Sequence, residues 1–362
     1  MDHRARQLRL RASLSKHHLD ALLVTQRPNV RYLCGFTGSA GALVVTSKQT
    51  VFFSDGRYTE QAQSEVKNAK IVIGRMSPSM AAAQWIRSKQ LRPAIKALGI
   101  EAEHLTLAER KNLANVLPAQ VRLRLVSPII ERLRMIKDAS ELDKLRDAVQ
   151  LGATLFDVAL KTIRPGAKEV EVAAEMEYAG RRHGAEAMSF ETIIAAGRRS
   201  ALPHGRATAT PIPDRGFVVC DFGVILAGYC SDMTRTVFVG KPSDRDRDVY
   251  SAVQEAQQAA VDAVRAGVTA GEVDAAARNI LKKRKLAKFF THSTGHGVGL
   301  EIHEAPRIAS GQTEPLTAGM VITIEPGAYI PEFGGVRIED MVAVTEAGCE
   351  VLTPTSKELI VI

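Results

Sequence analysis

The sequence has little cysteine, few aromatic side chains and no long apolar run. Its 362 residues include only four cysteines and one tryptophan. Cys34, Cys220, Cys230 and Cys349 show neither a CxxC spacing nor a tight framework, which predicts reduced thiols and no disulfide scaffold. No stretch approaches membrane-spanning length, and the charged segment 1–20 lacks the apolar core of a signal peptide. We therefore expect a cytoplasmic protein with no membrane partner.

The surplus of basic residues is confined to the first third of the chain. The net charge is +8, and residues 1–130 hold 20 Lys and Arg against 8 Asp and Glu, whereas residues 131–362 hold 28 against 32. The basic third lacks interleaved aromatic pairs and known nucleic-acid motifs, so a solvated basic surface is a better interpretation than a nucleic-acid site. We expect no nucleic-acid partner, with weak steering of anionic peptides as the alternative.

The chain is long enough for two domains, and its pattern changes near residue 130. Before that point, helical patterns alternate with the apolar runs DALLVT, GALVVT and TVFFSD, which is typical of a small α/β domain. Ser127-Pro128 ends the last apolar strand, and Asp138 with Glu141 forms a D-x-x-E capping box that opens a long helix. We therefore place one domain at 1–130 and a second at 131–362.

The second domain contains an internal repeat. Residues 164–174 (RPGAKEVEVAA) align with residues 265–275 (RAGVTAGEVDA) at an offset of 101, with five identical positions. Each copy belongs to a unit of two helices followed by a strand pair, and each strand pair carries two carboxylates. A duplicated α-then-β unit predicts an α+β domain in which both halves give their strands to one curved antiparallel sheet covered by helices.

The carboxylates of the two strand pairs are Asp221 and Asp232 in the first half and Glu325 and Glu339 in the second. Asp221 and Glu325 directly follow apolar strands, where an unpaired carboxylate is costly. Four converging acids would repel one another and raise their own pKa values unless a cation held them ionised. Together with His296 from a glycine-rich segment, the set is too large for a structural zinc ion and suits two divalent metal ions with bridging carboxylates.

The motifs around these five residues resemble the pita-bread metallopeptidases, in particular the Xaa-Pro group of prolidases and aminopeptidase P. They are DFG, SDMTRT, GHGVG, EPG and RIED. By this resemblance, Asp221 chelates one metal, His296 and Glu325 hold the other, and Asp232 and Glu339 bridge both. The resemblance also implies a pita-bread (creatinase/aminopeptidase) fold of the α+β class, two divalent ions with Mn²⁺ or Co²⁺ preferred and Zn²⁺ or Fe²⁺ as alternatives, and a homodimer.

The first domain resembles the creatinase-like α/β amino-terminal domain of the same family. The similarity lies in Tyr32–Ser39 (YLCGFTGS) and Asp55–Tyr58 (DGRY). Methionine aminopeptidases share the catalytic fold but generally lack this extra domain, which favours the proline-directed branch. A local ion pair between Asp55 and Arg57 that caps a helix is the alternative interpretation of the second motif.

Three further histidines match positions near the metals of this family. His204 in ALPHG and His303 in IHE fall at corresponding places in the two halves, which predicts that both contact the substrate and take part in catalysis. His292 lies four residues before His296 and is a third catalytic candidate. A lone histidine is more often structural, so the match in position carries these assignments.

Two arginines are also candidates by resemblance. Arg307, four residues after His303, resembles a prolidase residue that captures the free carboxylate of a dipeptide, with a surface salt bridge as the alternative. Arg337 precedes Glu339 by two residues, and we expect it to orient that carboxylate during catalysis.

The resemblance implies hydrolysis of the Xaa-Pro bond at the N-terminus of short proline-containing peptides. We expect a hydroxide bridging the metals to attack the carbonyl, Glu325 to take and later pass on a proton, and His303 with His204 to stabilise the oxyanion. Aminopeptidase P activity is the first prediction, and cleavage of Xaa-Pro dipeptides, as in prolidase, is the alternative. A metal-free peptide-binding protein of the same fold is a third interpretation.

Overall fold

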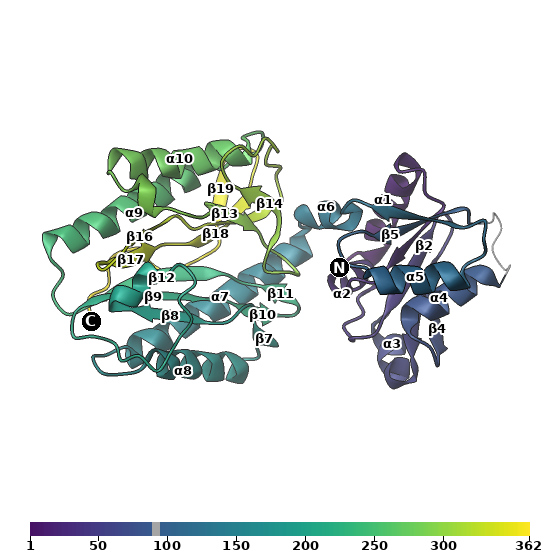
Figure 1. Ribbon diagram of the computed structural model, residues 1–362, viewed down its shortest axis with the longest axis horizontal. Coiled ribbons are helices and arrows are strands. Elements are labelled where there is room, and N and C mark those ends of the chain that lie inside the picture. Colours follow the sequence, from purple (N-terminus) through teal and green to yellow (C-terminus); the bar gives the residue numbers. More distant parts are fainter. Residues whose placement is uncertain (89–94) are drawn as a thin grey trace. The chain divides into compact units, whose positions relative to one another are not determined.

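The computed structural model describes residues 1–88 and 95–362, which form two compact units, Met1–Arg134 and Met135–Ile362 (Figure 1). The short helix α6 (Ile129–Met135) lies at this division, close to the boundary expected at residue 130. All four cysteines are free thiols, and three of them are buried. Within the described ranges, no helix is long and apolar enough to cross a membrane.

The amino-terminal unit is built on a six-stranded mixed sheet in the order β4-β3-β2-β1-β5-β6. The central strand β1 pairs antiparallel with β2 and parallel with β5. Buried side chains such as Leu23, Phe53 and Leu98 form one core between sheet and helices. The elements are α1 (His3–Lys16), β1 (Ala21–Val24), α2 (Arg27–Cys34), β2 (Ala42–Thr46), β3 (Thr50–Asp55), α3 (Thr59–Glu65), β4 (Lys70–Gly74), α4 (Pro78–Arg87), β5 (Ala97–Glu101), α5 (Leu107–Val116) and β6 (Arg122–Val126).

The DGRY segment of this unit forms a local cap at the end of β3. The Asp55 carboxylate accepts a hydrogen bond from the backbone N–H of Arg57 and pairs with the Arg57 guanidinium at 2.8 Å. The side chain of Arg57 is largely exposed. This geometry is the local ion pair that the sequence allows as the alternative for this motif.

The carboxy-terminal unit has two helix pairs with strands between them (Figure 1). Helices α7 and α8 precede the first group of strands, and α9 and α10 precede the second. The elements are α7 (Ala139–Thr162), α8 (Glu169–Arg182), β7 (Ala187–Met188), β8 (Ile193–Ala196), β9 (Gly216–Phe222), β10 (Val224–Leu226), β11 (Tyr229–Cys230), β12 (Met233–Val239), α9 (Asp244–Ala263), α10 (Ala270–Lys283), β13 (Gly295–Gly297), β14 (Glu304–Ile308), β15 (Val321–Ile324), β16 (Gly327–Ile330), β17 (Gly334–Arg337), β18 (Asp340–Val344) and β19 (Cys349–Val351).

The capping box predicted at the start of the long helix is confirmed. The Asp138 carboxylate accepts from the backbone N–H of Glu141, and the Glu141 carboxylate accepts from the backbone N–H of Asp138, each at 3.0 Å. Two donors at the helix start that lack partners within the helix are satisfied in this way. The helix ends before the sequence Arg164-Pro165-Gly166, where Gly166 adopts a positive φ of 82°.

The internal repeat is visible in the main-chain hydrogen bonds. In the first half, the Gly166 N–H donates to Ile212 O at 2.9 Å; in the second, the Gly267 N–H donates to Leu316 O at 2.9 Å. Gly166 and Gly267 are 101 positions apart and have nearly the same positive φ, 82° and 86°, which L-residues with a side chain rarely adopt. The turn after the first helix of each half is therefore the same structure, as the offset of 101 in the sequence predicts.

The strands of the two halves form separate sheets, of which the two largest lie one in each half. Strands β8, β9 and β12 form a three-stranded sheet packed on α7 and α8, and strands β13, β14, β15, β18 and β19 form a five-stranded sheet in the half that contains α9 and α10. The expectation of one continuous sheet is therefore wrong. The ladders stop where the acidic residues stand: β15 ends directly before Glu325, and Glu339 lies between β17 and β18. One main-chain bond, from Glu339 N–H to Thr234 O, joins the two sheets.

Candidate metal centre

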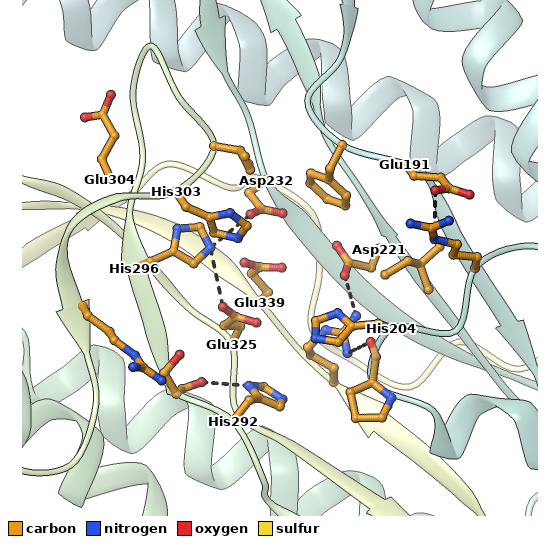
Figure 2. A pocket seen from close by; sticks show the side chains of 18 residues that line it. Glu191, His204, Asp221, Asp232, His292, His296, His303, Glu304, Glu325 and Glu339 are labelled. Carbon is orange, nitrogen blue, oxygen red and sulfur yellow. Dashed lines mark hydrogen bonds and ion pairs between the residues drawn. The ribbon is translucent and has the colours of Figure 1, made fainter. Parts of the chain in front are cut away.

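The five predicted ligand residues line one pocket of about 610 Å³ in the carboxy-terminal unit (Figure 2). One side-chain ligand atom from each of Asp232, His296 and Glu339 lies within 4.8 Å of the other two. His296 Nε2 is 3.6 Å from an oxygen of Asp232 and 3.6 Å from an oxygen of Glu325. Asp221, on β9, lines the same pocket. The structure therefore brings together the carboxylates of both halves, although they lie 93 to 118 positions apart in the sequence.

Close packing of β13 positions the histidine. A Cβ atom on Gly295 would lie 1.9 Å from Thr323 O, and one on Gly297 would lie 2.2 Å from Ala305 O. Only glycine fits at these two positions, because β13 lies between β14 and β15 in the sheet and the neighbouring backbone leaves no room for a side chain. His296, which stands between them, is held by this packing with its ring directed toward the acids.

The His296 ring is arranged to offer a lone pair to the pocket. Its Nδ1 lies 2.9 Å from Gly297 O, so Nδ1–H donates to this carbonyl and Nε2 is left as the acceptor. Burial lowers the pKa of His296 to about 4, which keeps the ring neutral near pH 7. A neutral imidazole with one nitrogen fixed by a backbone carbonyl and the other facing carboxylates is a typical metal ligand.

The acidic side chains are buried together without enough positive charge around them. Burial and the negative charges of their neighbours raise the pKa values of Asp232 and Glu339 well above the usual range, and burial raises that of Glu325 to about 8. Glu339 accepts from the Thr234 hydroxyl at 2.7 Å through one oxygen. Its other oxygen is buried and has no hydrogen-bond partner in the part of the chain that the structure describes.

A pair of divalent cations fits this arrangement. A buried carboxylate oxygen without a partner is costly, and a cation would satisfy it while lowering the pKa values of all the acids. The donors are carboxylate oxygens and one imidazole nitrogen, which suit hard or borderline divalent ions. We infer that the acidic cluster is built to hold metal.

Arg337 contacts a different carboxylate from the one expected. Its guanidinium pairs with Asp221, while its Nε donates to the Thr234 hydroxyl at 3.1 Å. That hydroxyl donates in turn to Glu339. Arg337 therefore reaches Glu339 through Thr234 and holds Asp221 directly, because β17 runs beside β9 and presents the guanidinium to it.

His292 is close to the centre, but both ring nitrogens already have partners. Its Nδ1 lies 2.8 Å from Ser293 O, and its Nε2 lies 2.8 Å from the Tyr329 hydroxyl, which accepts from Arg337 Nη1 at 2.6 Å. Burial, and to a lesser degree the charge of Arg337, lowers the pKa of His292 to about 4. In this geometry the ring is linked to the reacting centre through Tyr329 and Arg337.

The remaining candidates lie on the wall of the pocket. His204 and Arg307 are exposed and line it, and His303 packs its ring 4.5 Å from the ring of His296 (Figure 2). Burial lowers the pKa of His303. Among the described residues, no hydrogen bond or ion pair involves the Arg307 guanidinium, so it is available to an anionic ligand.

Sequence reasoning did not single out Thr234 and Tyr329. Both lie inside motifs that were noticed for other residues, Thr234 in SDMTRT and Tyr329 directly after EPGA. An uncharged hydroxyl in a buried strand gives no signal of its own, because its role depends on its partners: Glu339 is 105 positions from Thr234, and His292 is 37 positions from Tyr329.

Comparisons with known proteins cover the whole chain. Residues 143–346 match the profile of metallopeptidase family M24, and residues 6–136 match the creatinase/prolidase N-terminal domain. A Xaa-Pro dipeptidase of Pyrococcus horikoshii is 38% identical and is aligned over 96% of each chain. A solved Xaa-Pro dipeptidase from Bacillus anthracis is 40% identical with a TM-score of 0.96 and full coverage of both chains. An X-Pro aminopeptidase from Thermotoga maritima is 34% identical with a TM-score of 0.89, covering 95% of this chain and 98% of its own.

Proposed function

Because the chain belongs to metallopeptidase family M24, we propose that it hydrolyses the peptide bond before proline in short peptides, Xaa-Pro dipeptides included. The predicted family and the predicted fold of a creatinase-like domain followed by a pita-bread domain are confirmed. The observation that carries the proposal is the cluster of four carboxylates and His296 at the floor of a pocket that also holds His303 and Arg307.

We assign the metal-holding role to the five clustered side chains. Two divalent ions fit the donor set, with Mn²⁺ or Co²⁺ proposed first, and the ligands are Asp221, Asp232, His296, Glu325 and Glu339. Bound there, such ions would supply Lewis acidity to the scissile carbonyl and lower the pKa of water.

The side chains around the cluster can do the remaining work. Bound cations would favour the ionised form of Glu325, and as a carboxylate it can accept a proton from water and return it to the prolyl nitrogen. The imidazoles of His303 and His204 stand on the pocket wall, where an N–H can donate to the oxygen of the tetrahedral intermediate. His292 and Arg337 act on this step by holding Asp221 and Glu339 in place.

Arg307 favours dipeptides among the proline-containing substrates. Its guanidinium is exposed in the pocket and can form a bidentate pair with the C-terminal carboxylate of an Xaa-Pro dipeptide. The second candidate function is cleavage of longer peptides, and it is supported by the similarity of the chain to the X-Pro aminopeptidase of Thermotoga maritima. A metal-free peptide-binding role fits poorly with a buried, unpaired Glu339 oxygen.

The test compares hydrolysis of Ala-Pro, Ala-Pro-Ala and Ala-Ala by protein loaded with Mn²⁺ or Co²⁺. We expect Ala-Pro to be cleaved fastest and Ala-Ala not at all. Faster cleavage of Ala-Pro-Ala would assign aminopeptidase P activity, and no cleavage with any divalent metal would overturn the proposal. We further propose a homodimer, to be checked by analytical ultracentrifugation, and a cytoplasmic location, which suits the free thiols.

A further inference from the structure

A buried ion pair stands beside the pocket and has no role in the chemistry described above. Lys137 Nζ lies 3.2 Å from Glu304 Oε2, and the two side chains are only 1% and 6% exposed. Glu304 lines the pocket next to His303, but its carboxylate is turned away from the acidic cluster (Figure 2). Burying two charges is expensive, and apolar residues often stabilise a fold equally well. Stability alone therefore explains this pair poorly.

The lysine is attached to the strand that leads to Glu325. Its backbone N–H donates to Gly319 O at 2.8 Å, and Ile136 forms a β-bridge with Met320, directly before β15. These main-chain contacts fix the Cα atom of Lys137 relative to β15. Its ammonium group then reaches from this fixed point to the beginning of β14.

The glutamate organises the segment that carries His303. Glu304 Oε1 accepts from the backbone N–H of Glu301 at 3.1 Å, and the backbone N–H of Gly299 donates to Glu301 O at 3.0 Å. A Cβ atom on Gly299 would lie 2.8 Å from the carboxylate oxygens of Glu304. The chain between His296 and His303 therefore folds closely around this carboxylate.

We propose that Lys137 and Glu304 are positioning residues, which hold the His303 imidazole against the wall of the pocket. The ion pair ties the beginning of β14 to the base of β15, and so fixes His303 relative to His296 and Glu325. A charge-assisted bond has a defined direction, which an apolar contact lacks. The inference rests on the proposed function, because His303 acts on the peptide bond only if the pocket is a peptidase site.

The test uses Glu304→Gln, Lys137→Met and the double variant that carries both changes. Each single variant removes one member of the buried Lys137–Glu304 ion pair and should lower both Tm and kcat, kcat by roughly 10-fold to 100-fold. The double variant removes both charges of this pair, so its Tm should return close to that of the wild type while kcat for Ala-Pro stays low. Metal content should be unchanged throughout, and amide hydrogen exchange in residues 298–305 should be faster in all three variants.

Asp246→Asn is the matched control. Asp246 is a buried carboxylate paired with Arg215 at the start of α9, and it does not line the metal pocket. We expect a lower Tm with unchanged kcat. Recovery of kcat together with Tm in the double variant would overturn the proposal, as would wild-type kcat in the single variants. An inactive wild-type protein would instead contradict the proposed function, so the two failures are distinguishable.

Discussion

The two halves of the carboxy-terminal unit share one plan but contribute different chemistry to the pocket. Each has two helices, a glycine turn with positive φ and a sheet that delivers two carboxylates. The first half adds the imidazole of His204 on the pocket wall and the hydroxyl of Thr234, which bonds Glu339. The second adds the proposed nitrogen ligand His296, the guanidinium of Arg337 and the part of the wall that carries His303. The acids that surround the pocket therefore come from equivalent places in the two halves, whereas the other pocket residues differ between the halves.

The halves also orient each other's acids. Arg337 of the second half pairs with Asp221 of the first, and Thr234 of the first donates to Glu339 of the second. Behind them, the buried Arg235 donates to Glu339 O at 2.5 Å and to Asp340 Oδ1 at 2.7 Å. Among the described residues, one main-chain bond joins the two sheets at this point, and these side-chain contacts add to it.

The largest effect is expected from removing one acid of either half, each in a separate variant. Asp232→Asn and Glu339→Gln keep the shape of the side chain but remove the charge, and both residues are almost completely buried. We expect each change to lower kcat/KM for Ala-Pro more than about 1,000-fold and to reduce bound metal measured by mass spectrometry. If one half could lose its acid without loss of metal and turnover, the halves would not contribute equally.

The variant Thr234→Val tests the contact between the halves. It removes the hydroxyl of the first half that bonds Glu339, a proposed metal ligand of the second half. Glu339 would lose its donor, and we expect metal affinity to fall roughly 10-fold to 100-fold in calorimetric titrations. Thr236→Val is the matched control on the same strand, because the Thr236 hydroxyl bonds the main chain of Arg337. It should lower the free energy of unfolding by about 1–3 kcal/mol without changing metal affinity. Equal affinities in the two variants would contradict the account.

The pH dependence of the free energy of unfolding tests whether the acids of the two halves form one buried cluster. In the metal-free protein, Glu325 has a pKa of about 8, so between pH about 7 and about 8 the folded state keeps a proton that the unfolded chain has lost. The free energy of unfolding should therefore fall as pH rises over this range, as measured by urea denaturation. Saturating Mn²⁺ should remove the decline, because the bound cation favours the ionised acids. A rise in stability of the metal-free protein over this range would argue against the acidic cluster.

Other titrating groups interfere little within that range. His292 and His296 have pKa values of about 4 and are neutral in the folded protein, and histidines of the unfolded chain have largely lost their protons by pH about 7. Burial raises the pKa of Cys34, Cys220 and Cys230 to about 12, so their contribution, of the same sign, begins only where thiols of the unfolded chain ionise, above pH about 8.

The smallest effect is expected from an ion pair that joins the halves at the surface. Arg198 of the first half lies 2.8 Å from Glu332 of the second, and both side chains are more than 75% exposed. Arg198→Ala should change the free energy of unfolding by less than about 0.5 kcal/mol and leave kcat unaltered, because water screens the pair. A large loss of activity in this variant would mean that surface contacts also align the halves.

The gathering of the acids in one pocket could be predicted because these residues lie in local patterns. Asp221 and Glu325 each follow an apolar strand, and the offset of 101 residues pairs the two halves before any contact is known. Contacts across the halves could not be predicted. Thr234 and its partner Glu339 are 105 positions apart in the sequence, and Lys137 and its partner Glu304 are 167 positions apart. Nothing in either local pattern encodes such a partner.

The sheet was mispredicted for a related reason. Apolar periodicity marks where a strand lies, but it does not say which ladders remain joined. Glu325 and Glu339 lie outside the strands, at points where the strand ladders are interrupted. The side chains of both residues line the pocket there. The order of helices and strand pairs along the chain was therefore predicted, and the continuity of the sheet was not.

The central claim is that both halves together hold two metal ions that hydrolysis requires. The direct test removes all divalent metal with a chelator, verifies the removal by mass spectrometry and titrates Mn²⁺ back, while calorimetry and Ala-Pro hydrolysis are followed together. We predict no turnover in the metal-free protein, binding of two equivalents per chain and full turnover only when both are bound. Full turnover by verified metal-free protein would contradict the account.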